Sequence, residues 1–116
     1  MKWKYVADKK SGQVGHIPVF VVFDDGSSES LASAAKHSPD GFQIGYGGSG
    51  PSELAYSLLL DYAVRSKKYG LLDNLSKAEK YYQQFKNDFI VDAKEHFEIN
   101  SDSVGLWLEV QEYEKV

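Results

Sequence analysis

Cysteine is absent from this 116-residue chain, and basic residues are outnumbered by acidic ones. Without cysteine, disulfides, thiolate metal sites and thiol nucleophiles are excluded. The 13 Lys and Arg against 17 Asp and Glu give a net charge of −4, so counterion release does not drive tight binding to a nucleic acid backbone. We therefore expect no nucleic-acid partner.

Long apolar runs are also missing. No stretch approaches the roughly 18 apolar residues of a membrane span, and residues 1–10 lack the apolar core of a signal peptide. We expect a cytoplasmic protein without membrane contact. With 42% hydrophobic and 26% charged residues, the composition is that of a folded protein, and the length predicts a single domain over residues 1–116.

Strand patterns dominate the first third of the chain. Residues 2–7 alternate between polar and apolar side chains, as a half-buried strand does. Residues 16–23 are rich in β-branched and aromatic side chains, and the following Asp25-Gly26 favours a tight hairpin turn. Residues 28–38 are ambiguous: their alanines favour a helix, but the hairpin before them favours a returning strand, which is our prediction.

Two helices are predicted next. Leucine recurs at helical spacing over residues 51–68, where Pro51 suits the first helical position and Gly70 suits the exit. The capping-box pattern 76-SKAE-79 predicts the start of the second helix, because Ser and Glu at this spacing satisfy each other's N–H groups. The apolar stripe of this helix is expected to face the core and comprises Ala78, Tyr82, Phe85, Phe89 and Ala93.

Residues 104–113 alternate again and predict a closing strand with an apolar face of Val104, Leu106, Leu108 and Val110. The predicted order is strand, strand, strand, helix, helix, strand. This order indicates an α+β fold in which two helices pack on one face of an antiparallel sheet of about four strands.

A glycine-rich stretch, 41-GFQIGYGGSGPSE-53, leads into the first predicted helix. It matches G-x-G-x-x-G formally, but no second parallel strand follows, and proline stands where the lysine of a P-loop belongs. Two interpretations stay open: an anion site at a helix N-terminus, or a structural loop whose glycines allow positive φ and close approach. Glu53, in the first predicted turn, would already complement the helix dipole.

A ligand at this loop would meet backbone N–H groups, an aromatic ring for stacking, and a polar or positive side chain just upstream. The candidate ligand-binding residues are Lys36, His37, Tyr46, Gly47, Gly48, Ser49 and Gly50. The alternative for His37 is that it, or Ser38, caps a turn. The three histidines have no metal-ligand spacing, and we predict neither a metal nor a cofactor.

Trp107 alternates with the apolar face of its predicted strand and is expected on the opposite side of the sheet. Together with Trp3 and Tyr5 it would form an exposed aromatic surface for another subunit or a partner protein. The alternative is that the N-terminal strand or a loop covers it.

Two stretches, 37-HSPDGFQIGYGGSGPSELAYSLLLDY-62 and 81-YYQQFKNDFI-90, resemble a small domain family found in bacteria and phages. Its members carry His-Ser-Pro, Gly-Phe, Gly-Tyr-Gly-Gly-Ser-Gly-Pro before a leucine-rich helix, and Tyr-x-x-Phe-Lys in the next helix. Ile44 stands where that family is expected to carry tryptophan. The resemblance implies no particular activity, but it implies a phage-type context in which small acidic proteins act by binding.

The leading hypothesis is a non-enzymatic, oligomeric protein that binds and sequesters a phosphorylated or nucleotide-like ligand at the glycine loop. The alternative is an interaction module that inhibits a host defence protein, with a purely structural glycine loop. A hydrolase using Ser49 or His37 is a third class, but no G-x-S-x-G elbow supports it, and we predict no catalytic residue.

Overall fold

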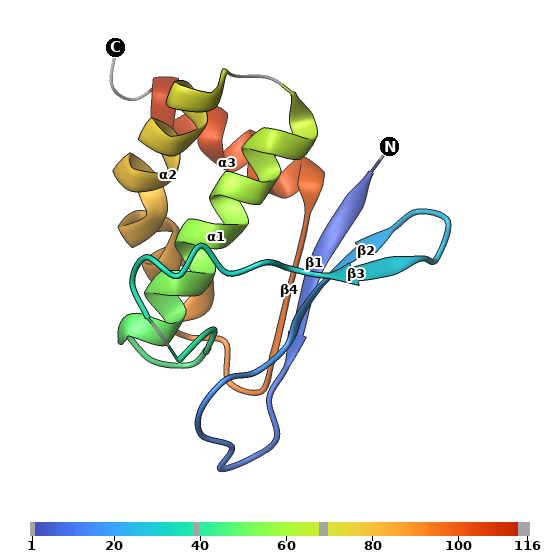
Figure 1. Cartoon of the computed structure of the whole chain (residues 1–116), viewed down its shortest axis with the longest axis vertical. Helices are drawn as coiled ribbons and strands as arrows, with labels where there is room; N and C mark the ends of the chain where they lie inside the picture. Colours follow the sequence, from blue (N-terminus) through green and yellow to red (C-terminus); the bar gives the residue numbers. More distant parts are fainter. Residues whose placement is uncertain (1, 39, 68–69, 114–116) are drawn as a thin grey trace.

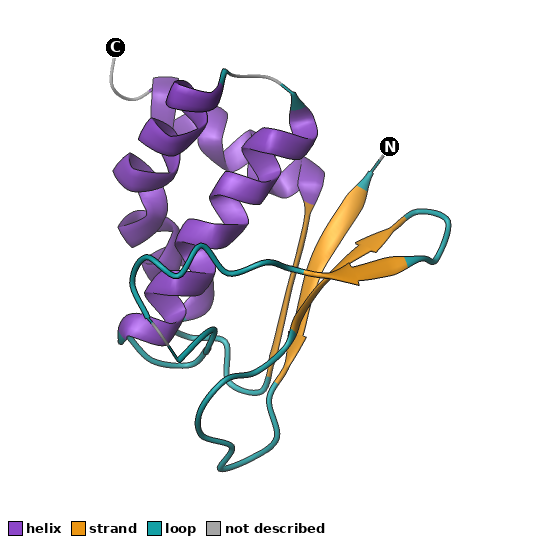
Figure 2. Ribbon diagram, viewed as in Figure 1, coloured by secondary structure: helices purple, strands orange, loops and turns teal. Residues whose placement is uncertain are grey.

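A computed structural model of the chain describes residues 2–38, 40–67 and 70–113. It is an antiparallel four-stranded sheet in the order β3-β2-β1-β4, with the helices gathered on one side of it (Figures 1 and 2). The strands are β1 (Trp3–Asp8), β2 (Val19–Phe23), β3 (Ser28–Ser30) and β4 (His96–Asn100). The helices are α1 (Ser49–Ser66), α2 (Leu71–Phe85), a π-helical turn η1 (Lys86–Ile90) that continues α2, and α3 (Ser101–Tyr113).

The first two strands and their turn confirm the prediction. β1 is central and pairs antiparallel with β2 and with β4, and its alternation buries Tyr5 and Ala7. The β2–β3 hairpin closes where Phe23 N–H donates to the carbonyl of Ser27 at 2.8 Å. Gly26 in this turn has φ +88°, a conformation that glycine adopts without steric cost.

The third strand is shorter than predicted over residues 28–38, because only Ser28–Ser30 pairs with β2. Leu31 then enters the core, and the chain continues as a loop across α1 (Figure 1). Three backbone N–H groups of this loop donate to the carboxylate of Glu53 in α1 instead of to a neighbouring strand.

The predicted helix boundaries need correction. α1 begins at Ser49, so Pro51 is its third residue, and the helix ends before Lys67, whose φ of 54° breaks the right-handed geometry. The predicted end at Lys68 lies outside the described residues. Gly70 is the N-cap of α2 and not the exit of α1.

The capping-box prediction for the start of α2 is wrong. Ser76 lies inside α2, which begins at Leu71, and the carbonyl of Gly70 accepts the N–H of Asn74 at 2.9 Å. The extended backbone of Gly70 therefore starts the helix six residues earlier than the side-chain pattern indicated.

The predicted strand over residues 104–113 is also wrong, because these residues form most of α3. The Asn100 side chain, at the end of β4, accepts the N–H of Ser103 at 2.8 Å and so caps the helix. The closing strand is β4 instead. The predicted α+β class with helices on an antiparallel sheet is confirmed, and the order becomes β-β-β-α-α-β-α.

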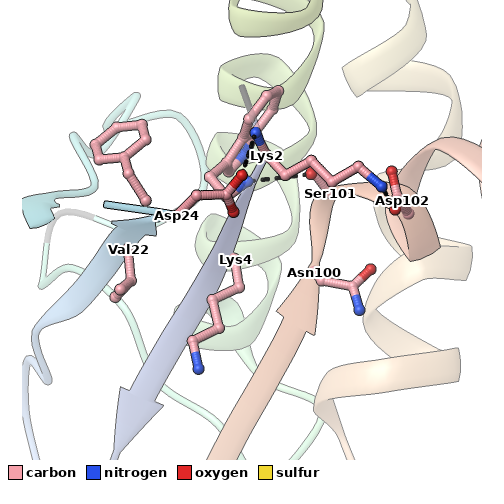
Figure 3. A pocket seen from close by; sticks show the side chains of 9 residues that line it. Lys2, Lys4, Val22, Asp24, Asn100, Ser101 and Asp102 are labelled. Atoms are coloured by element: carbon pink, nitrogen blue, oxygen red, sulfur yellow. Dashed lines mark hydrogen bonds and ion pairs between the residues drawn. The ribbon is translucent and has the colours of Figure 1, made fainter. Parts of the chain in front are cut away.

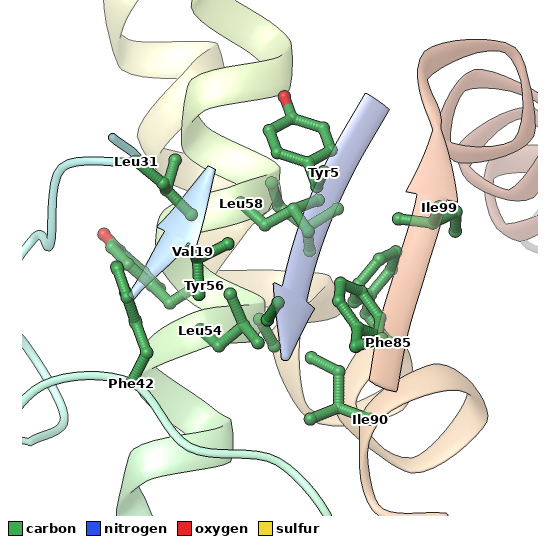
Figure 4. Close-up of a cluster of buried hydrophobic side chains, with 14 of the residues drawn as sticks. Tyr5, Val19, Leu31, Phe42, Leu54, Tyr56, Leu58, Phe85, Ile90 and Ile99 are labelled. Atoms are coloured by element: carbon green, nitrogen blue, oxygen red, sulfur yellow. The ribbon is translucent and has the colours of Figure 1, made fainter. Parts of the chain in front are cut away.

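One core joins the sheet to the helices. Side chains from the inner face of β1, β2 and β4 meet those of α1, α2 and η1 (Figure 4). Along the predicted stripe of the second helix, Ala78 and Phe85 are buried, while the other three members pack partly buried against the core. The labelled core residues include Tyr5, Val19, Leu31, Phe42, Leu54, Tyr56, Leu58, Phe85, Ile90 and Ile99.

Candidate functional site

Glu53 is a fully buried carboxylate, 0% exposed, in the second turn of α1. One of its oxygens accepts three consecutive backbone N–H groups, from Lys36 at 2.9 Å, His37 at 2.6 Å and Ser38 at 3.2 Å. Such a row of N–H groups is an anion-binding nest. Here the protein supplies the anion itself, so this nest is closed to an external ligand.

The second oxygen of Glu53 accepts the hydroxyls of Ser33 and Ser57, each at 2.9 Å. Burial raises the pKa of Glu53, but hydrogen bonds from His37 N–H, both hydroxyls and Ser38 N–H outweigh burial and lower the pKa below its ordinary value. Glu53 is therefore ionised at neutral pH.

The first turn of α1 has no acidic residue. The expectation that Glu53 complements the dipole from the first turn is wrong, because the helix starts at Ser49 and Glu53 is its fifth residue. Its charge serves the loop of residues 33–38 instead. The positive end of α1 thus has no acidic side chain in its first turn.

The glycine loop is anchored to the π-helical turn. Gly45 N–H donates to the carbonyl of Ile90 at 3.0 Å, and Gly45 has φ +88°. A Cβ added at Gly45 would lie 3.0 Å from the carbonyl oxygen of Ala93. Both the dihedral angle and the close approach require glycine at this position, as the structural interpretation expects.

The remaining loop glycines differ in their surroundings. A Cβ at Gly50 would lie 2.6 Å from Cβ of Gln43, and one at Gly48 would lie 2.5 Å from the ring of Tyr46. A Cβ at Gly47 would meet nothing within 4 Å, and Gly47 does not have positive φ. Packing therefore explains Gly50 but leaves Gly47 unexplained.

Lys86 is buried beneath this loop, with 7% of its surface exposed. Its ammonium group donates to Ser52 Oγ at 3.1 Å and to the carbonyl of Gly47 at 3.3 Å. Both acceptors are neutral, and no carboxylate of the described residues pairs with Lys86. A buried cation at the positive end of a helix is electrostatically unfavourable unless an anion joins it.

The start of α1 also has free donors. Among the residues that the structure describes, no hydrogen bond uses the N–H of Gly47, Gly48, Ser49 or Gly50. A hollow of about 140 Å³ lies beside Ser49 and Gly50. Its lining residues are Gly15, Ser38, Asp40, Gly41, Gln43, Tyr46, Ser49 and Gly50.

The hollow brings together three predicted ligand residues, Tyr46, Ser49 and Gly50. The other four predicted ligand residues do not line it: Lys36, His37, Gly47 and Gly48. The His37 ring stacks on Tyr82 at 4.3 Å between centroids, and Lys36 pairs with Glu79 at 3.4 Å. Both side chains fasten the upstream loop to α2. In the described part of the chain, no group of three or more His, Asp or Glu side chains is arranged to hold a metal ion.

Sequence reasoning missed Asp40, which lines the hollow, and Lys86, which lies beneath the loop and does not line the hollow. Lys86 was visible as the last residue of the Tyr-x-x-Phe-Lys motif, directly after the buried stripe position Phe85. Its neighbours Gly47 and Ser52 are 39 and 34 positions away in the sequence, so the pattern did not indicate what it contacts.

The predicted aromatic surface does not form. Trp107 lies on α3 and not on a strand, so the expectation that it faces the far side of the sheet is wrong. It packs edge-on against Phe85 at 5.2 Å, and its indole N–H donates to Asp88 at 2.8 Å. Trp107 therefore joins α3 to the end of α2.

Tyr5 is fully buried and its hydroxyl donates to Asp61 at 2.8 Å, so it offers no contact surface. Trp3 is half-buried beside a hollow of about 300 Å³ (Figure 3). Both lysines that line that hollow are already paired, Lys2 with Asp102 at 2.7 Å and Lys4 with Glu98 at 3.3 Å, and Asp24 accepts the backbone N–H of Lys2 at 3.3 Å. It presents no unpaired charge comparable to Lys86.

One comparison with known proteins gives a match, and it covers most of the chain. Residues 11–110 match a family of unknown function, DUF6166. The chain belongs to this family. The match includes the glycine loop, Glu53 and Lys86. It shows membership of a family of unknown function, while the shared motifs and the phage origin stay predictions. No curated protein and no solved structure matches this DUF6166 chain.

The described part of this DUF6166 chain has no helix with the length and apolar character needed to cross a membrane. Its α3 does expose an apolar stripe at spacings of four and three: Leu106, Val110 and Tyr113. Spacings of this kind place the three side chains on one helix face.

Proposed function

We propose that this DUF6166 chain is a non-enzymatic binding protein that holds a phosphorylated or nucleotide-like molecule at the glycine loop. The observation that carries the proposal is the buried ammonium of Lys86, which has only neutral acceptors and lies at the positive end of α1. An anion at the loop would compensate both positive charges at once.

The charge balance around Lys86 favours an external anion. An unpaired buried charge costs several kcal/mol even after relaxation, and the helix N-terminus adds a charge equivalent to about +0.5. Each hydrogen bond of a charged group contributes about 1.5–3 kcal/mol, but neither acceptor of Lys86 carries a negative charge that would neutralise it. A ligand oxygen in the hollow would also accept the free N–H groups of Ser49 and Gly50.

The volume of the hollow limits how much of a ligand it encloses. Ligand pockets usually measure about 300–1,000 Å³, whereas this hollow measures about 140 Å³. It has room for a phosphoryl group but not for a whole nucleotide. Tyr46 lines the hollow and is 46% exposed, and the Lys9 ammonium lies over its ring at 5.5 Å from the centroid. A base or another planar group outside the hollow would stack on the exposed part of this ring.

Binding without turnover suggests sequestration. In the phage-type context that the family resemblance implies, a protein of this kind would withdraw a host nucleotide signal from its receptor. This activity requires stoichiometric binding and no catalytic group.

Calorimetric titration with inorganic phosphate, nucleotides and cyclic dinucleotides tests the proposal. At a hundredfold excess over Kd, a ligand of the folded state stabilises it by about 2.7 kcal/mol, which a thermal melt detects. No heat with any of these compounds, together with an unchanged melting temperature, would overturn the proposal.

Lys86→Met sharpens the test. It removes the charge but keeps the apolar stem, so we expect lost binding with a ligand-free melting temperature that is equal or higher. Lys80→Met, an exposed lysine on α2, is the matched control and should bind normally. A Lys86→Met protein that is less stable and still binds would assign Lys86 a purely structural role.

A second candidate function is a protein–protein interaction module, such as an inhibitor of a host defence protein. The observation that favours it is the exposed stripe of Leu106, Val110 and Tyr113 on α3. If this stripe joins two copies of the chain, light scattering should give a dimer mass that Leu106→Glu reduces to a monomer mass. A monomer at all concentrations would contradict an oligomer formed through α3.

A further inference from the structure

We infer that the open edge of β3 and the groove between it and α1 form a docking site for an extended peptide segment of a partner protein. The segment would add a fifth strand to the sheet, place an aliphatic side chain in the groove, and pair a lysine or arginine with Asp61. This inference goes beyond the proposed function, because it concerns a different surface and a different class of partner.

β3 is an edge strand of the sheet (Figure 1). Leu31 N–H donates to the carbonyl of Val19 in β2 at 2.8 Å, and successive N–H groups of a strand point to opposite sides. The N–H groups of Ser30 and Ala32 therefore point away from β2, and no hydrogen bond of the described residues uses either of them. An extended peptide pairs with such a row of backbone groups.

The sequence of residues 28–34, SESLASA, leaves this edge unprotected. Edge strands of natural proteins are usually blunted by proline, lysine or a bulge, or covered by another element. This stretch contains neither proline nor lysine, and Ser28–Ser30 is exposed along its whole length. Its one charged side chain, Glu29, pairs with Arg65 of α1. The small side chains therefore leave the backbone of the edge accessible.

A groove of about 260 Å³, the β3–α1 groove, lies between the chain after β3 and α1. At one end the N–H of Ala34 donates to Ser57 Oγ at 3.0 Å, so α1 closes the edge there. Val64 is 53% exposed although it is apolar. An aliphatic side chain of an added strand would cover Val64 and Leu60. The residues that line the groove are Ala32, Ser33, Ala34, Ser57, Leu60, Asp61 and Val64.

Asp61 is the charged residue among those that line the groove. One of its oxygens accepts the Tyr5 hydroxyl at 2.8 Å and Arg65 Nε at 2.7 Å, and the other has no hydrogen bond within residues 2–38, 40–67 and 70–113. Arg65 also pairs with Glu29, so two carboxylates share one guanidinium and one negative charge is left. Lys67 lines a separate hollow. A lysine or arginine of the peptide complements this charge.

A second copy of the chain matches the groove less well than such a peptide. A second β3 would present serine and glutamate side chains, and its Leu31 is only 6% exposed because it lies in its own core. It would also bring another glutamate to a groove that is already negative. The apolar lining and the charge both favour a segment of another protein with aliphatic and basic residues.

Selection from a displayed library of random ten-residue peptides, with the full chain as bait, tests the inference. We expect the enriched peptides to share an aliphatic residue and a lysine or arginine, and to bind in calorimetry as synthetic peptides. Exchange of the basic residue for glutamate should weaken binding at least about tenfold. Hydrogen exchange measured by NMR should show that the bound peptide protects the N–H groups of Ser30 and Ala32.

Two variants remove separate parts of the site. Val64→Glu places a second carboxylate in the groove, and Ser30→Pro removes an N–H group that points away from β2. Each should weaken peptide binding at least about tenfold. Ser30→Ala is the matched control, because it removes the hydroxyl but keeps the N–H group, and it should bind as the wild type does. Val64 is exposed, so Val64→Glu provides the test even if Ser30→Pro does not fold.

The remaining outcomes overturn the inference. It fails if no peptide is enriched, or if the enriched peptides bind Val64→Glu as tightly as Ser30→Ala. A wild-type dimer in light scattering that Ser30→Pro converts to a monomer would assign the edge to a second copy and exclude the peptide. The anion site at the glycine loop is tested separately by Lys86→Met.

Discussion

The backbone N–H of His37 donates to the carboxylate of Glu53 at 2.6 Å, the shortest of the five hydrogen bonds that this carboxylate accepts. One side chain of α1 therefore holds the loop of residues 33–38 in place. The loop in turn positions Ser38 and Asp40 at the hollow beside the glycines.

Glu53→Gln should destabilise the chain by on the order of 3 kcal/mol. The carboxamide replaces an acceptor with a donor and leaves buried N–H groups of the loop without a partner. Urea denaturation measures the loss, and Glu95→Gln, an exposed residue, is the control. A loss below about 1 kcal/mol would mean that the loop does not depend on this carboxylate.

The stability contributed by Glu53 should depend on pH in one direction. Its pKa in the folded chain lies below the ordinary value of 4.5, so the folded state holds fewer protons than the unfolded state in this range. The contribution is complete above pH 4.5 and is lost as the pH falls through the folded pKa. Denaturation of wild-type and Glu53→Gln protein at several pH values should show the steeper acid loss in the wild type, and parallel curves would contradict this assignment.

Two glycines of the loop should respond differently to alanine. Gly45→Ala places a Cβ at φ +88° against a carbonyl oxygen and should cost about 1–3 kcal/mol. Gly47→Ala meets open space and should change stability by less than about 0.5 kcal/mol. Thermal melts of both variants decide the point. Similar large losses at both positions would contradict the open surroundings of Gly47.

Two leucines test the helical assignment of residues 104–113. Leu108 is 4% exposed and Leu106 is 64% exposed, whereas a strand would place both on one face. Leu108→Ala should cost about 2–5 kcal/mol, and Leu106→Ala less than about 0.5 kcal/mol. Equal losses in chemical denaturation would favour the strand that the sequence pattern indicated.

The contrast between β1 and α3 explains how much of the fold was predictable. The side chains of residues 2–7 alternate with a period of two only, and Asp25-Gly26 is typical of a hairpin turn. Local sequence patterns were therefore enough to predict β1 and the hairpin. The apolar residues at 104 and 108 fit a period of two as well as a helical period. What decides between them is the Asn100 side chain at the end of the preceding strand, a cap that the alternating pattern concealed.

The candidate site was predictable only in part. The glycines and the helix start are neighbours in sequence and were found as a loop. The contacts of Lys86 and Glu53 depend on which segments meet in three dimensions. The Glu53 carboxylate accepts hydrogen bonds from residues 33–38 and does not face a ligand. Because one sequence contains no record of such pairings, the charge balance at α1 emerges only from the fold.

The π-helical turn Lys86–Ile90 restricts the number of residues in this segment more than it restricts their side chains. The hydrogen bond from Val91 N–H to the carbonyl of Lys86, 3.0 Å, spans five residues. Deleting one of them would restore an α-helical pitch and turn all that follows by about 100°, carrying the Ile90 carbonyl away from Gly45. Members of DUF6166 are therefore expected to align without gaps through this turn, even where their side chains differ.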